Sequence, residues 1–272
     1  MVPEALVLDD LGRLFVLDRE ENAIFRLAET DWIAFSAGGQ GAQRSAIISR
    51  LDVLGPDLFA LDPVGLVLYR FDLEGRLKSP ISLGRSLAVA GIDRVDAVDF
   101  AMTKSGELLL LDRAGRRLLL FDRFGVFVTD LAEGASGRER FRSPLELTLD
   151  GSGEIYVLDP PDRSVRRFSR QGEARPPWRY DGGLSGDAAR GRHVAATPWG
   201  QIVVAAEDGS WIRVFAADGL LLAAEEFPER AGRTLADLVA GPDSVLYLAE
   251  PEKGEIGRLG LTYPDALPAT RR

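Results

Sequence analysis

A segment of related sequence returns along the 272-residue chain and limits what it can fold into. The copies are "RLFVLDREENAIFRL", "DLFALDPVGLVLYRFDLEG", "ELLLLDRAGRRLLLFDRFG", "EIYVLDPPDRSVRRFSRQG", "QIVVAAEDGSWIRVFAADG" and, in part, "SVLYLAEPEKGEIGRL". The residues that close the strongest apolar run are 44, 50, 47, 47 and 44 positions apart: Asp18, Asp62, Asp112, Asp159, Ala206 and Glu250. A period in this range, with four short strands per unit, is typical of β-propeller blades.

The repeat around residues 142–180 shows why each unit should contain strands. "LELTLD" alternates apolar and polar residues with period two, as a half-buried strand does. "EIYVLD" is an almost continuous apolar run, which indicates a strand covered on both faces. "SVRRFS" follows as a third strand, and the residues toward Trp178 form a weak outer one.

The sequence therefore predicts an all-β protein, a six-bladed propeller of four-stranded antiparallel blades that occupies residues 1–272 as one domain. A single unit cannot bury its own faces, so each blade must pack on its neighbours. The last blade is expected to be incomplete, because the tail "LTYPDALPATRR" has little strand character. The expected blades are residues 3–39, 45–84, 94–133, 142–180, 191–228 and 233–272.

Composition excludes several chemistries. There is no cysteine, which removes disulfides, thiolate metal sites and cysteine nucleophiles. The formal net charge of −9 argues against nucleic acid as the main partner. No apolar run is long enough to span a membrane, and the abrupt start in a strand favours an extracytoplasmic location with a removed leader over a cytoplasmic one.

Repeat register predicts a ring of polar residues on the innermost strands. The position thirteen before the closing acid is Glu146 in the fourth repeat. Its expected equivalents are Asp52, Asp99, His193 and Asp237, with Ala5 in the first repeat. Three interpretations stay open: carboxylates that cap backbone N–H groups of the next blade, a ligand-binding channel, or a metal or catalytic site.

An arginine stands just upstream of this position in most repeats. It could pair with the ring acids or hold an anionic ligand, since guanidinium suits carboxylate and phosphate. These residues are Arg50, Arg94, Arg142, Arg192 and Arg233.

The unit "G-x-[IL]-[YFL]-[VL]-[AL]-D … [VIL]-x-x-F-x-x-x-G" resembles the NHL-repeat family, whose members form six-bladed propellers. Repeats one to four match well, the fifth lacks the Asp and the sixth is partial. The resemblance implies the fold and little about function, since NHL-like proteins include RNA binders, substrate modules of ligases, lyases and bacterial proteins of unknown role. Related lactonase propellers hold calcium with several Asn, and related lyases use several His; this chain has Asn22 and His193 alone.

No cofactor is predicted, although oxygen-only calcium binding by Asp52, Asp99, Glu146 and Asp237 stays open. No nucleophile-elbow motif accompanies His193, so no catalytic residue is assigned. The closing acids Asp18, Asp62, Asp112 and Asp159 are expected to accept backbone N–H groups in Asx-turns.

Long interblade loops rich in Gly, Ser and Arg form the other candidate surface, because loops on a rigid scaffold commonly carry recognition. One of them, with Arg138, Arg140, Phe141 and Arg142, could touch RNA. We expect a non-catalytic binding or scaffold protein that recognises a protein or small ligand through the channel mouth and the interblade-loop face. The alternative is a metal-assisted hydrolase or lyase that uses the acidic ring with His193.

Overall fold

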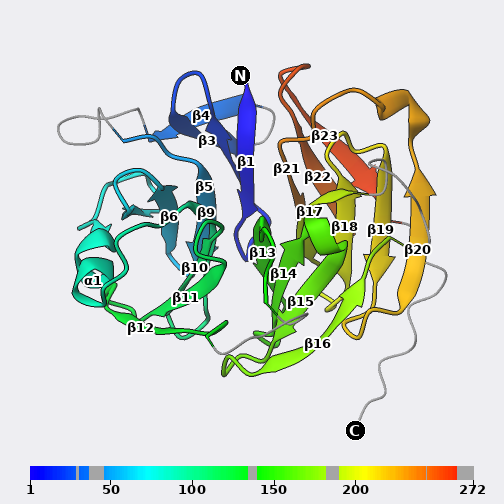
Figure 1. Ribbon diagram of the computed structural model, residues 1–272. Helices are drawn as coiled ribbons and strands as arrows, with labels where there is room; N and C mark the ends of the chain where they lie inside the picture. Colours follow the sequence, from blue (N-terminus) through cyan, green and yellow to red (C-terminus); the bar gives the residue numbers. More distant parts are fainter. Residues whose placement is uncertain (29–30, 37–45, 134–139, 182–189, 243, 262–272) are drawn as a thin grey trace, which may run out of the picture.

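Six antiparallel sheets are arranged around a central axis in the computed structural model (Figure 1). The structure describes residues 1–28, 31–36, 46–133, 140–181, 190–242 and 244–261. Five sheets have four strands in chain order and the sixth, in the described residues, has three. The predicted six-bladed propeller is therefore confirmed, and its last blade has three strands within the described residues.

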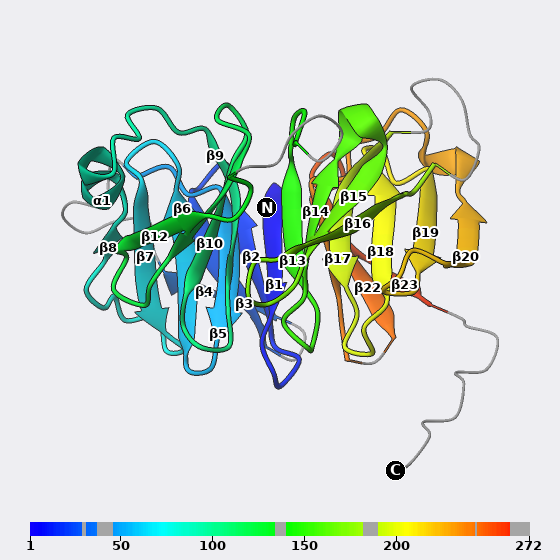
Figure 2. The same cartoon turned by 60° about the horizontal axis from the view of Figure 1, so that its bottom comes forward.

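Each blade begins at the axis and runs outward (Figure 1), and Figure 2 shows the same ring from an oblique angle. Blades one to three contain β1 (Pro3–Leu8), β2 (Leu14–Asp18), β3 (Ala23–Ala28), β4 (Asp31–Ser36); β5 (Arg50–Leu54), β6 (Asp57–Asp62), β7 (Val67–Asp72), β8 (Ile81–Ser82); and β9 (Ala97–Met102), β10 (Leu108–Asp112), β11 (Arg117–Phe121), β12 (Phe127–Asp130). Blades four to six contain β13 (Glu146–Leu149), β14 (Ile155–Asp159), β15 (Ser164–Phe168), β16 (Ala174–Arg179); β17 (Gly191–Ala196), β18 (Ile202–Ala206), β19 (Trp211–Phe215), β20 (Leu221–Glu226); and β21 (Asp237–Ala240), β22 (Val245–Glu250), β23 (Glu255–Gly260).

The second strand of each blade is the most buried element, as its apolar run predicts. In β14 and β10 every residue is buried. A helix of one to two turns, α1 (Gly84–Val89), lies in the connection between blades two and three. No helix within the described ranges has the length and hydropathy that a membrane span requires.

The turns use the residues that their backbone conformation requires. Between β13 and β14, Asp150 accepts the N–H groups of Ser152 and Glu154 through Oδ1, at 2.8 and 3.0 Å. Gly153 takes a φ of 87°, which a residue with a Cβ rarely adopts. These hydrogen bonds and this glycine set the length of the hairpin, and the hairpin length sets the register of the innermost strand.

The core consists of six apolar layers between neighbouring blades. Innermost strands contact one another around the whole ring, including β1 with β21, so blade six closes on blade one. The layer at this closing seam is the smallest, with four buried residues against nine or more at every other seam. They are Leu6, Leu14, Val16 and Ala249.

Candidate functional site: a polar ring in the channel

Strand pairing defines which residues occupy equivalent positions around the axis. In blade four, Glu146 lies opposite Leu158, the residue before the closing acid. We call the six residues at this position the channel ring: Ala5, Arg50, Asp99, Glu146, His193 and Asp237.

The prediction that Asp52 belongs to this ring is wrong. Asp52 pairs with Phe59, whereas Arg50 pairs with Leu61 and holds the ring position. The hairpin of blade two, "GP", shortens the unit by one residue, whereas a ring position for Asp52 would require a unit three residues shorter. A cation thus replaces one of the expected carboxylates.

Three ring carboxylates accept a backbone N–H from the innermost strand of the next blade. Asp99 Oδ2 lies 2.7 Å from the nitrogen of Leu147, and Glu146 Oε2 lies 2.8 Å from that of Val194. Asp237 Oδ2 receives the N–H of Leu6 at 2.8 Å and joins the last blade to the first. Each of these hydrogen bonds ties two blades together.

The second oxygen of these carboxylates is also occupied. Asp99 Oδ1 accepts the N–H of Phe100 at 2.9 Å, and Asp237 Oδ1 accepts that of Leu238 at 2.8 Å. Glu146 Oε1 lies 3.0 Å from Nδ1 of His193. The capping interpretation therefore accounts for every oxygen of the three ring acids.

A second layer of interblade hydrogen bonds lies two residues further along the strands. Asp52 Oδ2 accepts the N–H of Met102 at 2.6 Å, and Oγ1 of Thr148 accepts that of Ala196 at 3.1 Å. Thr148 is opposite Tyr156, the position equivalent to Phe59, so Asp52 and Thr148 are counterparts. The sequence reasoning missed Thr148, which the interval between equivalent strands could have identified.

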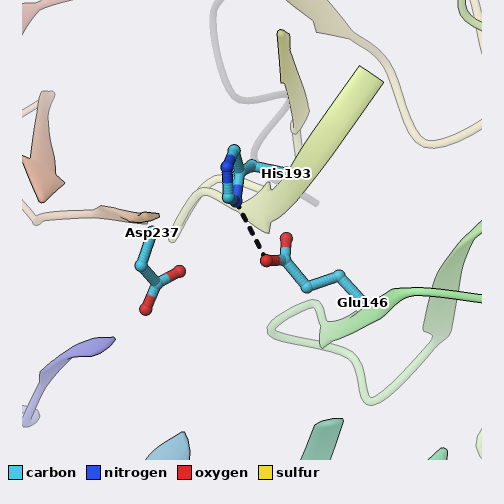
Figure 3. A group of neighbouring side chains, drawn as sticks. All are labelled: Glu146, His193 and Asp237. Carbon is cyan, nitrogen blue, oxygen red and sulfur yellow. Dashed lines mark hydrogen bonds and ion pairs between the residues drawn. The ribbon is translucent and has the colours of Figure 1, made fainter. Parts of the chain in front are cut away.

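His193 is buried, and both of its ring nitrogens face oxygen acceptors, an arrangement that favours the protonated imidazolium. Its Nε2 lies 2.8 Å from the carbonyl oxygen of Leu235, which can only accept, so this nitrogen carries a proton. Its Nδ1 faces the carboxylate of Glu146, and the three-residue group with Asp237 is seen in Figure 3. Burial opposes the charge, but Glu146 outweighs it and raises the pKa of His193. His193 thereby joins blades four, five and six.

The ring acids differ in protonation because their neighbours differ. Burial tends to raise the pKa of Glu146, but the charge of His193 and its hydrogen bond bring that pKa below the ordinary value. Burial raises the pKa of Asp99 well above its usual range, against the opposing charge of Arg50. Burial and the charge of Glu146 raise the pKa of Asp237 to about 6, and burial does the same for Asp52.

Only one of the predicted arginines reaches the ring. Arg50 Nε lies 3.6 Å from Asp99 Oδ1, and its terminal nitrogen donates to the carbonyl of Ser49 at 2.9 Å. The other four, on or next to the interblade loops, are exposed: Arg94, Arg142, Arg192 and Arg233. Of these, Arg142 pairs with Asp162 at 2.7 Å.

The predicted hydrogen bonds from the following turn form at three of the four strand-closing acids, and the prediction is wrong for Asp159. Asp62 Oδ1 accepts the N–H groups of Val64 and Gly65, and Asp18 and Asp112 accept from the turns after them in the same way. Asp159 instead accepts the N–H groups of Arg142 and Ser143, from the preceding loop. The two prolines that follow Asp159 have no N–H to offer.

The RNA-patch prediction is wrong for its aromatic residue. Phe141 is 1% exposed, and its ring packs on that of Phe168 with centroids 5.9 Å apart. It cannot stack on a base. Arg138 lies outside the described residues, and Arg140 and Arg142 are exposed.

The predicted calcium set is not brought together either, because Asp52 belongs to the second layer. Among the residues that the structure describes, Glu146, His193 and Asp237 form a different group that could hold a metal ion. One potential ligand atom from each lies within 4.8 Å of the others. All these atoms already take part in the hydrogen bonds described above.

No family model matches the chain, and no curated protein does. A catalytically inactive histidine-to-alanine variant of virginiamycin B lyase from Staphylococcus aureus, solved with quinupristin, is 14% identical with a TM-score of 0.67, over 96% of this chain and 82% of that one. A streptogramin B lyase structure is 13% identical with the same TM-score, over 97% and 84%. The Cps50 (Swd1) propeller of Myceliophteria thermophila is 15% identical with a TM-score of 0.65, over 96% and 84%. At this identity the likeness concerns the fold alone.

Proposed function

We propose that this chain is a non-catalytic binding or scaffold propeller of the NHL-repeat kind, which recognises a protein or small ligand through its interblade-loop face and channel mouth. The observation that carries the proposal is the state of the ring carboxylates. Both oxygens of Asp99, Glu146 and Asp237 accept hydrogen bonds that hold strands in place. Chemistry at the ring would have to compete with closure of the propeller.

His193 supports the same conclusion. A general base or metal ligand needs a nitrogen with a free lone pair, and both nitrogens of His193 face oxygen acceptors. Deprotonation would leave Nδ1 facing the carboxylate of Glu146 without a proton between them. The residue that most resembled a catalytic one is suited to joining blades.

The interblade-loop face offers groups that recognition requires. Val64 and Val89 are 78% and 86% exposed, on the turn after β6 and at the end of α1. The exposed Arg94 follows on the same connection as α1. In a propeller the turns from second to third strand and the interblade connections share one face, so apolar and cationic groups combine there. A partner with an apolar patch and nearby carboxylates would fit this surface.

The test compares two faces of the same protein. We would immobilise the full chain and identify proteins retained from an extract of the source cells by quantitative mass spectrometry. The Val64→Asp, Val89→Asp variant should lose the specific set. The matched Phe124→Asp, Val126→Asp variant, which changes exposed residues in the turn after β11, should retain it. Loss with the second variant alone would contradict the proposed face.

A metal-assisted hydrolase or lyase is the second candidate, supported by the grouping of Glu146, His193 and Asp237. The site would need the Nδ1 proton of His193 to leave, so binding would release protons and strengthen with rising pH. Calorimetric titration with Zn²⁺ and Ca²⁺ at pH 6 and 8 tests this. Binding that His193→Gln abolishes at both pH values would favour the enzyme.

We further propose an extracytoplasmic location. It is supported by the resemblance to NHL-like bacterial propellers. Fractionation of source cells with an antibody against the chain is the direct test, and recovery in the cytoplasmic fraction would contradict it.

A further inference from the structure

The outer edge of blade six differs from that of the other blades. In blades one to five the third strand pairs with a fourth: β4, β8, β12, β16 or β20. In the described part of the chain, β23 pairs with β22 alone. The other edge of β23 has backbone N–H and C=O groups of the kind that pair with a fourth strand in the other five blades. An edge with such groups is a template for another strand.

Side-chain exposure shows the consequence. Ile256 lies opposite Ala249, the residue before the closing acid, and it has an equivalent in each other blade. All five equivalents are 3% exposed or less: Ile24, Leu68, Leu118, Val165 and Ile212. Ile256 is only partly buried. The position that is sealed five times is only partly covered by the described residues of blade six.

A cavity of about 340 Å³ lies beside this edge, at the seam with blade one. Leu14, Leu27 and Trp32 of blade one form one wall, and Ile256 and Arg258 belong to the other. We call this cavity and the free edge of β23 the blade-six slot. Between blades four and five, the corresponding outer strand inserts an aromatic residue toward its neighbour: Trp178 of β16 packs on Phe215 with centroids 4.6 Å apart. The structure thus shows what kind of group fills such a seam.

We propose that the blade-six slot binds an extended segment of a partner protein, which adds to β23 as an antiparallel fourth strand and places a large apolar side chain in the cavity. The inference rests on the proposed binding function and names the partner's form. Backbone pairing would supply affinity and the cavity would supply selectivity, as in other strand additions.

Charges on β23 specify the partner further. Glu255 and Arg258 are exposed on either side of Ile256 and Gly257. Opposite charges on directly facing residues of paired strands stabilise the pair. The partner strand would therefore have an acidic residue opposite Arg258, any residue opposite Gly257 and a large apolar residue opposite Ile256. A basic residue would lie opposite Glu255.

A second copy of this chain fits the slot less well. Two β23 strands can pair antiparallel so that Glu255 of each faces Arg258 of the other. That register places Gly257 of the second copy opposite Ile256, and glycine has no side chain to fill the cavity. Charge pairing and filling of the cavity therefore point to a strand of different sequence.

The probe is a fluorescein-labelled peptide, Thr-Glu-Val-Trp-Lys-Thr with blocked ends, titrated against the full chain by fluorescence anisotropy. We expect saturable binding that weakens at least tenfold when alanine replaces the peptide's Trp. Exchange of its Glu and Lys should weaken binding several-fold. N-methylation of the alternate peptide nitrogens that face β23 should abolish binding, because it removes the backbone hydrogen bonds between the peptide and the strand.

Two variants locate the peptide. Ile256→Lys should weaken binding at least tenfold, while Val128→Lys, on the outer strand β12 of blade three, should leave it unchanged. Circular dichroism spectra that match that of the wild type are the check that both variants fold. Unchanged binding by Val64→Asp, Val89→Asp separates this slot from the interblade-loop face, so either proposal can fail without the other.

Four results would overturn the inference. The first is that the peptide does not bind the full chain. The second is binding that N-methylation leaves intact. The third is binding seen only after removal of residues 262–272, which would assign the edge to the chain's own C-terminal segment. The fourth is a dimer in sedimentation experiments that Ile256→Lys converts to a monomer, which would assign it to a second copy.

Discussion

The axis and the outer rim of this propeller meet the same need in different ways. At the axis, each blade must attach to the next, and Asp99, Glu146 and Asp237 each accept a backbone N–H from the innermost strand of the following blade. At the rim, a fourth strand covers the third in five blades and is absent from the described part of the sixth. The comparison teaches that polar residues with occupied partners maintain the ring, whereas the edge of β23 has no strand partner besides β22 among the described residues and is where we propose that a partner binds.

The largest expected effect on the free energy of unfolding comes from removing an interblade contact at the axis. Glu146→Ala removes the acceptor of Val194 and leaves the cation of His193 buried without its partner. Loss of one member of a buried ion pair typically costs about 3–5 kcal/mol. Urea unfolding measures the change, and Glu20→Ala, at an exposed turn residue, is the control that should stay within about 0.5 kcal/mol of wild type.

The rim can be tested with one substitution at two equivalent positions. Ile212→Ala, under the complete blade five, should cost about 2–5 kcal/mol, because it opens a cavity in a sealed layer. Ile256→Ala, in the open blade six, should cost less than about 1 kcal/mol, since its side chain is partly in water. Equal losses in urea unfolding would show that blade six is closed in solution.

The pH dependence of stability tests the charge state of the axis. Asp52 and Asp237 have folded pKa values of about 6, above their unfolded values, so the folded state binds more protons as pH falls through that range. The raised pKa of His193 acts in the same direction: its contribution is complete below its unfolded pKa and is lost as pH rises through the folded one. The free energy of unfolding should therefore fall from about pH 4 to about pH 6 because of the two aspartates, and again above the unfolded pKa of histidine because of His193, by on the order of 1 kcal/mol for each unit of pKa shift.

The readout is the difference between wild type and variants, because the net negative charge also lowers stability as pH rises. Asp237→Asn should flatten the profile between about pH 4 and 6, and His193→Gln should flatten it above the unfolded pKa of histidine. Profiles parallel to wild type in both variants would contradict the assigned protonation states.

The smallest effect is expected at an exposed arginine of the interblade-loop face. Arg142→Ala breaks an ion pair with Asp162, but the arginine side chain is 67% exposed, so the free energy of unfolding should change by less than about 0.5 kcal/mol. A loss above 2 kcal/mol would mean that the loop face is structural, which would weaken the distinction between attachment at the axis and recognition at the surface.

Sequence reasoning predicted the features that repeat and missed those that do not. The blade period identified the fold, and equal spacing placed Asp99, Glu146, His193 and Asp237 at one level. It misplaced Asp52, because the register there depends on a hairpin one residue shorter, which several alignments of "LDVLGPDLF" can accommodate. Phe141 was assigned to the surface from its arginine-rich neighbours, although tertiary packing on Phe168 buries it. The open slot at β23 involves residues from both ends of the chain, and a local pattern cannot show such a contact.

The central claim is that the channel ring closes the propeller and that its three carboxylates and His193 are all engaged in the contacts that do so. The most direct test is urea unfolding of the Asp99→Asn, Glu146→Gln variant and of wild type, each in EDTA and in Zn²⁺ or Ca²⁺. The account predicts that the variant is less stable by more than about 2 kcal/mol, since an amide offers one acceptor atom where a carboxylate offers two, and that metal changes neither protein. Equal stability in EDTA, with a metal-dependent stabilisation of wild type that the variant lacks, would contradict it.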